Sequence, residues 1–187
     1  MNTAIAPSDA VQKKPDMFRT ISQAALLTGT LDIIAANIHF YFDTGRAASL
    51  RLFGTEEAVP FFSYLAHGGM CKYIARAVFG DLATTGGTLM IVWGIVFHYI
   101  IAFLFTAFLF VTYTWMIKKL QNKSVVVIIY GAFIWMMMNL LVIPLSKINK
   151  FPSDPVNSIT ALFIVTLLIG WPVCLLAHRF YAKKGVV

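Results

Sequence analysis

Four long apolar segments constrain this chain more than any other feature of its sequence. They run from about residue 21 to 42, 88 to 115, 125 to 145 and 159 to 180. Each is close to the ~20 residues that a helix needs to cross a ~30 Å hydrocarbon core. Because a backbone in lipid must satisfy its own hydrogen bonds, helix is the only reasonable state for each segment. The sequence therefore predicts an all-α fold, a polytopic transmembrane four-helix bundle.

The composition favours the same class of protein. Hydrophobic residues make up 59% of the 187 residues and charged residues only 12%, with a mean hydropathy of +0.76. A soluble domain is about a quarter charged, so the shortage of charge argues against a soluble surface. The net charge of +7 comes from basic residues at the ends of the apolar segments, where headgroups and orientation signals account for them. No basic face interleaved with aromatic residues exists outside the apolar runs, so we expect no nucleic-acid partner.

The basic residues also predict an orientation. The tight loop from Lys118 to Lys123 is the strongest short basic loop, and such loops stay in the cytoplasm. We therefore expect a flexible cytoplasmic tail over residues 1–20, a transmembrane domain over 21–182 and a second cytoplasmic tail over 183–187. The first apolar segment is too long for a signal peptide and carries Asp32 and His39, which predicts a retained span.

The stretch between the first two spans, residues 44–83, is predicted to be an extracytoplasmic cap. Ile74, Ala77 and Val78 follow helical spacing, which predicts one or two short amphipathic helices on the outer face or over the bundle. Gly68-Gly69 and Gly86-Gly87 are the predicted breaks around them. The alternative is a re-entrant hairpin, which the charges of this segment disfavour.

Each span carries one stripe of small or polar residues on an otherwise bulky surface. Spacings of four and seven residues place each set on one helical face. The sets are Thr28, Asp32, His39 and Asp43; Gly94, His98, Ala102 and Thr106; Gly131, Trp135 and Asn139; and Thr166, Gly170, Cys174 and His178. For the glycines, Ala102 and Thr166 the expected role is packing, because small residues let helix backbones approach.

Asp32 is the residue that packing explains least. It lies midway along its span, where an aspartate costs ~2.5–3.5 kcal/mol on insertion scales, so it should face the interior and have a partner. His98 has a matching depth on an antiparallel helix, and Asn139 lies about a turn closer to the outer face. A carboxylate beside an imidazole suits a proton relay or a site for a cationic substrate. We therefore predict a substrate or proton site built from Asp32, His98, Asn139, Thr28 and His39. The alternative is a structural pair that fixes helix register.

A metal site is a weaker prediction. His39 and Asp43 are four residues apart at the outer end of the first span, and His67 lies in the loop above with Glu56 and Glu57. Imidazole and carboxylates suit a divalent ion, but no spacing signature links these residues, so solvation at the outer face is the expected account. We expect no metal and no other cofactor. No nucleophile elbow, P-loop or dinucleotide fingerprint occurs, so we do not expect an enzyme.

Several runs carry a family resemblance. They are WGIVFHYIIAF from Trp93, YGAFIW from Tyr130 and NLLVIPLS from Asn139. They resemble uncharacterised four-span bacterial inner-membrane proteins. A looser similarity is to the YagU-like membrane proteins, which have a histidine-bearing second span and a proline that ends the third. The resemblance covers roughly residues 26–178. It implies a bacterial inner-membrane (plasma-membrane) location, and it brings no established activity.

The expected function is the handling of a small solute or protons through the polar midplane site. One alternative is a non-catalytic accessory or assembly subunit, whose small-residue stripes pack against partner helices. Another is a lipid- or quinone-binding protein, with the phenylalanine-rich second span lining an apolar groove. Besides the lipid bilayer, the expected partners are a second copy of the chain, in a homo-oligomer, or a partner membrane protein.

Overall fold

A computed structural model describes the backbone of residues 16–53 and 60–187, and the side chains of 16–42 and 60–187. All regular secondary structure in these ranges is helical, which confirms the all-α prediction. The longest helices are α1 (Met17–Phe53) and α5 (Gly87–Leu120). The third span is formed by α6 (Lys123–Met136), the π-helical segment η1 (Met137–Val142) and α7 (Ile143–Leu145). The fourth is formed by α8 (Pro155–Val165), the π-helical segment η2 (Thr166–Gly170) and α9 (Trp171–Lys183).

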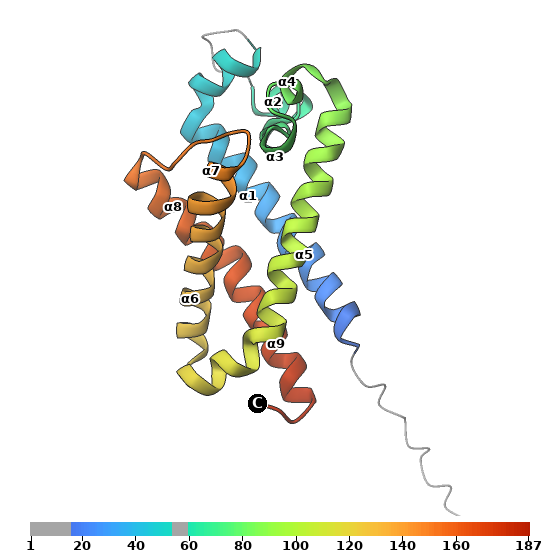
Figure 1. Cartoon of the computed structure of the whole chain (residues 1–187), viewed down its shortest axis with the longest axis vertical. Coiled ribbons are helices and arrows are strands. Elements are labelled where there is room, and N and C mark those ends of the chain that lie inside the picture. Colours follow the sequence, from blue (N-terminus) through green and yellow to red (C-terminus); the bar gives the residue numbers. More distant parts are fainter. Residues whose placement is uncertain (1–15, 54–59) are drawn as a thin grey trace, which may run out of the picture.

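Four stretches of the described chain are long and apolar enough to cross a membrane. They are Met17–Phe42, Gly87–Leu120, Lys123–Leu145 and Pro155–Lys183. They form an up-and-down bundle (Figure 1), and the chain is a multi-pass membrane protein. We call the end that holds α2, α3, α4 and α7 the cap end. The opposite end holds the α5–α6 turn and the C-terminus, and we call it the basic end because Lys118, Lys119 and Lys183 lie there.

The segment between α1 and α5 contains three short helices in its described part. They are α2 (Phe61–Ala66), α3 (Gly69–Phe79) and α4 (Leu82–Thr85). The chain turns at Gly68 (φ 103°), Gly80 (φ 63°) and Gly87 (φ 60°), conformations that glycine adopts without the steric cost of a Cβ. The predicted breaks at Gly68-Gly69 and Gly86-Gly87 are confirmed, and Gly80 adds a third. The first helix also continues to Phe53, well beyond the predicted end at residue 42.

The cap is a wedge set into the end of the bundle. Helix α3 packs against α5 and α1, and in Figure 1 it is seen nearly end-on beside α5. Gly94 permits this contact, because a Cβ at that position would collide with the carbonyl oxygen of Cys71. From the other side, the backbone N–H of Lys147 donates to the carbonyl of Ala77 at 3.0 Å. The cap is therefore held by the second span and by the loop after the third.

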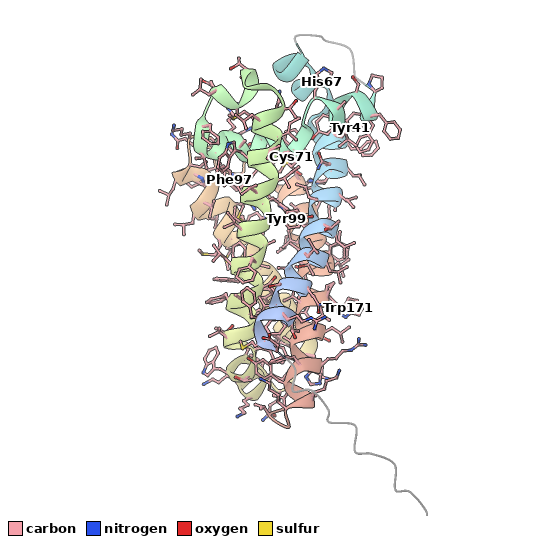
Figure 2. All side chains as sticks on the ribbon, turned by 90° about the vertical axis from the view of Figure 1, so that its right-hand side faces the viewer. Tyr41, His67, Cys71, Phe97, Tyr99 and Trp171 are labelled. Carbon is pink, nitrogen blue, oxygen red and sulfur yellow. The ribbon has the colours of Figure 1, made fainter. Side chains whose placement is uncertain are left out.

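The length of α5 follows from this wedge. Its 34 residues span roughly 51 Å at 1.5 Å per residue, more than a ~30 Å hydrocarbon core requires. The turns at its cap end are covered by α3, where the ring of Phe79 lies 6.0 Å from that of Trp93 and 5.9 Å from that of Phe97 (Figure 2 labels Phe97 and Cys71). The additional turns of α5 therefore have protein rather than lipid along one side.

The most tightly packed core lies toward the basic end. Phe110, Tyr113, Val126, Tyr130 and Val173 are buried there at 0–1% exposure. The hydroxyl of Tyr130 donates to the carbonyl of Phe105 at 2.5 Å, which satisfies a phenol that is otherwise surrounded by apolar groups. This packing closes the interior of the bundle at the basic end.

Both π-helical segments precede a proline. η1 ends two residues before Pro144, and η2 ends two residues before Pro172. Proline has no N–H to donate, and its ring clashes with the carbonyl four residues earlier. Wider π-helical turns accommodate both effects. The third and fourth spans therefore both leave α-helical geometry where they border the interior cavities described below.

The contact at Gly94 gives a first testable prediction. Gly94→Ala should force α3 away from α5 and lower the free energy of unfolding by about 1–3 kcal/mol, the usual cost of overpacking. The measurement is reversible unfolding of the purified protein in detergent micelles. Val96→Ala, at an exposed position two residues further along α5, is the control and should change stability far less. Equal stability of Gly94→Ala and the parent would contradict the wedge.

Candidate functional site

The candidate site begins at a close contact between α1 and α5. A Cβ on Gly29 would lie 3.1 Å from the Cβ of Ala102 and 3.2 Å from the ring of Tyr99. Next to it, the hydroxyls of Thr30 and Tyr99 are 2.8 Å apart and share a hydrogen bond (Tyr99 is labelled in Figure 2). Small residues allow such close approach of two helices, and the packing role predicted for Ala102 is confirmed here.

His98 is fixed by the backbone of α1. Its Nε2 lies 2.7 Å from the carbonyl oxygen of Gly29, and the residue is only 8% exposed. A carbonyl oxygen only accepts, so Nε2 carries the proton. In the neutral imidazole, the lone pair therefore resides on Nδ1. The orientation of the ring and its tautomer are both set by one carbonyl.

Asp32 lies one turn after Gly29 on α1, close enough for its charge to interact with that of His98. The sequence predicts these two residues as a pair, and in the structure both line the same small cavity. The hydrogen bond of His98 Nε2, however, goes to Gly29. Sequence reasoning missed Gly29 because a backbone acceptor has no side-chain signature. The only available signal was its position one turn before Asp32, without a side chain to block the approach.

Asp32 and His98 both border a small interior cavity of about 110 Å³. Thr28 also lines it, and the Thr28 hydroxyl donates to the carbonyl of Ala24 at 2.8 Å. Ile74 of α3 contributes to the wall, so the cap helps to enclose this cavity. The cavity is large enough to hold water, and its carboxylate and imidazole supply the polar partners that a buried water requires.

A second cavity of about 330 Å³ lies on the cap side of the first, and we call it the vestibule. It is bordered by α1, α3, η1, α8 and the loop before α8. Asp32, Met138 and Val165 line both cavities. Asp32 is only half-buried for this reason, although it lies in the middle of its span. Its carboxylate therefore stands between the vestibule and His98.

The vestibule combines aromatic rings with polar groups. Trp135 contributes an indole Nε1 that is buried with no hydrogen-bond partner in the described chain, which leaves a donor for water or a ligand. Tyr73 contributes a hydroxyl whose pKa is raised by burial, although the charge of Arg76 opposes the shift, so this phenol stays neutral. Lys150 and Asp154 add one charge of each sign. The Asp154 carboxylate also caps α8 by accepting from the Val156 N–H at 2.9 Å.

The predicted site residues divide between the two cavities. Thr28 and His98 line the inner cavity, His39 and Asn139 line the vestibule, and Asp32 lines both. Asn139 does not reach the His98 cavity, and its Nδ2 donates to the carbonyl of Trp135 at 3.0 Å. It lies in η1, and π-helical segments are frequent at functional sites.

The fourth-span stripe does not join this site. Cys174, His178 and Thr166 line a groove between α6 and the fourth span, which is described below. Gly170 packs toward α6, where its Cβ would lie 3.2 Å from the carbonyl oxygen of Val127. A Cβ on Gly131 would collide with Thr166, which confirms the packing role predicted for this pair.

The weak metal candidates are not brought together by the described residues. The side chain of Asp43 lies outside them, as do Glu56 and Glu57. His39 lines the vestibule, whereas His67 lies in the cap with its Nδ1 2.8 Å from the carbonyl oxygen of Ser63. Within residues 16–42 and 60–187, no group of three or more histidine, cysteine or acidic side chains is placed to hold a metal ion.

The tautomer of His98 is directly testable. In protein with ¹⁵N-labelled histidine, the neutral ring of His98 should show a protonated Nε2 and an unprotonated Nδ1, because the Gly29 carbonyl accepts from Nε2. The measurement is the ¹⁵N chemical shift at mildly alkaline pH, with His98→Gln used to assign the signals. His67, which lies outside the spans, is the internal comparison, because its Nδ1 and not its Nε2 lies beside a carbonyl oxygen, that of Ser63. A neutral His98 protonated on Nδ1 would contradict the Gly29 contact.

Comparison with known proteins adds no further constraint on this site. No family model, no curated protein and no solved structure matches the chain. The resemblance to four-span inner-membrane proteins stays a prediction, and the functional argument rests on the geometry of the two cavities.

Proposed function

We propose that this membrane protein handles protons or a small solute through the site built on Asp32 and His98. The observation that supports this most is the position of Asp32, which borders both the vestibule and the inner cavity. A proton or solute that enters from the vestibule meets the carboxylate before the imidazole. Ionisable groups inside a membrane span are costly, and they usually serve a function.

The chemistry of the pair suits reversible proton binding. The lone pair on His98 Nδ1 is free to accept a proton while Nε2 remains bonded to Gly29. Asp32 borders the same cavity as His98, so a proton at this site has both a carboxyl group and an imidazole to bind to. A proton is thus held by the pair while the carbonyl of Gly29 keeps the ring in place.

The packing of the bundle supports access from one side. The vestibule lies toward the cap end, whereas the buried core around Phe110, Tyr113 and Tyr130 separates the inner cavity from the basic end. Transport to the basic end requires this core to open. The segments η1 and η2 are suited to that change, because irregular turns at midplane sites are a common feature of transporters. We place the cap end outside and the basic end in the cytoplasm of a bacterial inner membrane, as the Lys118–Lys123 loop predicts.

The proposal predicts a proton flux that depends on both residues. Full-length protein is reconstituted in liposomes that contain a pH-sensitive dye, and a potassium gradient with valinomycin sets the membrane potential. Asp32→Asn and His98→Gln should each lower the protein-dependent proton flux by about 100-fold, the usual contribution of a positioned acid or base.

Asp81→Asn is the matched control. It removes one carboxylate from an exposed ion pair with Arg76, in which the N–O distance is 2.7 Å, and it should leave the flux unchanged. Parent-level flux in both Asp32→Asn and His98→Gln would exclude a proton route through the pair. If the parent protein carries no proton flux and no solute binds at Asp32, Asp32 and His98 have a purely structural role.

A further inference from the structure

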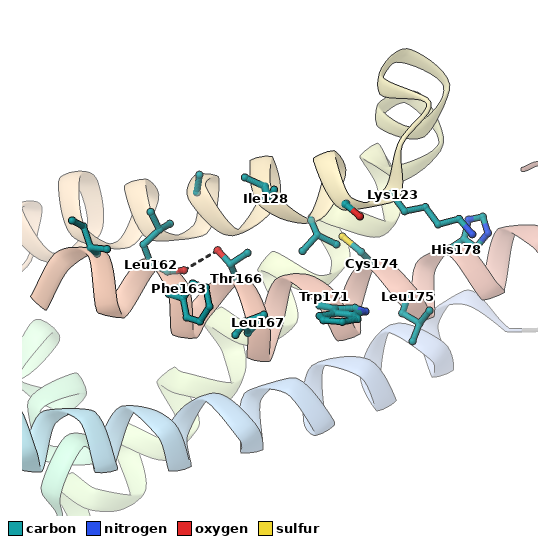
Figure 3. Close-up of a pocket in the computed structure, with 14 residues that line it drawn as sticks. Lys123, Ile128, Leu162, Phe163, Thr166, Leu167, Trp171, Cys174, Leu175 and His178 are labelled. Atoms are coloured by element: carbon teal, nitrogen blue, oxygen red, sulfur yellow. Dashed lines mark hydrogen bonds between the residues drawn. The ribbon is translucent and has the colours of Figure 1, made fainter. Parts of the chain in front are cut away.

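A second candidate binding site, a long groove, lies outside the Asp32–His98 site. It has a volume of about 590 Å³ and runs between α6 and the fourth span (Figure 3). Its walls are mainly apolar and include Val127, Ile128, Leu167 and Trp171. The volume is in the range of ~300–1,000 Å³ that ligand sites usually occupy.

The middle of the groove stays apolar because the hydroxyl group of Thr166 is already bonded. The hydroxyl of Thr166 donates to the carbonyl of Leu162 at 2.7 Å, the bond drawn in Figure 3. This polar group is therefore satisfied within its own helix. On the facing helix, Gly131 has no side chain, which allows Thr166 to pack closely. The middle of the groove is therefore shaped for a hydrocarbon chain.

Only the end of the groove toward the basic end carries positive charge. Lys123 and His178 lie beside each other there, close enough to interact electrostatically, as Figure 3 shows. The Nδ1 of His178 is buried with no hydrogen-bond partner in the described chain. None of the residues that line the groove is acidic, and Lys123 forms no salt bridge among the described residues. This end therefore offers an anion the ammonium group of Lys123 and an unpartnered ring nitrogen of His178, with no carboxylate in the groove beside them.

We propose that this groove binds an anionic phospholipid, with an acyl chain along Val127 and Leu167 and the phosphate at Lys123 and His178. The groove has the polarity of such a lipid, with one cationic end and a long apolar remainder. A second copy of the chain is a poorer occupant, because two parallel copies meeting here bring their Lys123 side chains together.

The test is native mass spectrometry of the full-length protein with phosphatidylglycerol or phosphatidylcholine of identical acyl chains. The parent should retain phosphatidylglycerol preferentially. Lys123→Gln should weaken its binding by about fivefold, as expected for the loss of one lysine near a headgroup. Leu167→Trp, which fills the apolar part of the groove, should weaken the binding of both lipids.

Lys119→Gln is the matched control, because it removes the same charge from the same end but does not line the groove. Binding that is weakened equally by Lys119→Gln and Lys123→Gln would reduce the effect to net charge and overturn the site. Equal retention of the two lipids, or undiminished retention in Leu167→Trp, would overturn it too. A dimer that protects Leu167 and Trp171 from labelling would assign the groove to a second copy instead.

Discussion

In a bilayer, no hydrophobic force draws one apolar helix to another, so this bundle depends on positions where a missing side chain lets two backbones meet. Gly29 brings α1 to α5, Gly94 brings α3 to α5, and Gly131 brings α6 to the fourth span. The first of these contacts also makes the candidate site. His98 reaches the carbonyl of Gly29 only because no side chain stands between the helices. The packing and the chemistry of this protein therefore share the same residues.

The cavities occur where this regular packing is interrupted. Pro144 and Pro172 each follow a π-helical segment, and residues of both segments, together with Val165 just before η2, line the two interior spaces. A wider turn changes the direction of the following side chains and leaves room beside the helix. Asp32 faces this room from α1. The result is a carboxylate that lies deep in the bundle and still has space for water or a solute beside it.

Much of the fold could be predicted from the sequence, and each feature that was missed has a definite physical cause. The spans follow from hydropathy, and the breaks before α3 and before α5 follow from Gly68 and Gly87, because these are properties of single residues or short windows. The continuation of α1 to Phe53 was missed because its residues after Phe42 are too polar to be counted in a span. For the site, depth along each helix placed Asp32 near His98, but the Gly29 carbonyl has no sequence signal. On the fourth span, Thr166, Cys174 and His178 do share a face, but that face lines the groove beside α6 instead of the Asp32–His98 site, because spacing along one helix does not say which neighbour the face meets.

The wedge formed by α3 also orders the assembly of the protein. The surface that α3 packs against is formed by more than one helix. Cys71 of α3 packs against Gly94 of α5, and Ile74 lines the inner cavity between α1 and α5. Residues 60–85 are synthesised before α5, so α3 can reach this position only after the second span has been made. The bond from Lys147 to Ala77 forms later still, after the third span is in place. Docking of α3 thus marks the completion of the first hairpin, and its final attachment marks the arrival of the third span.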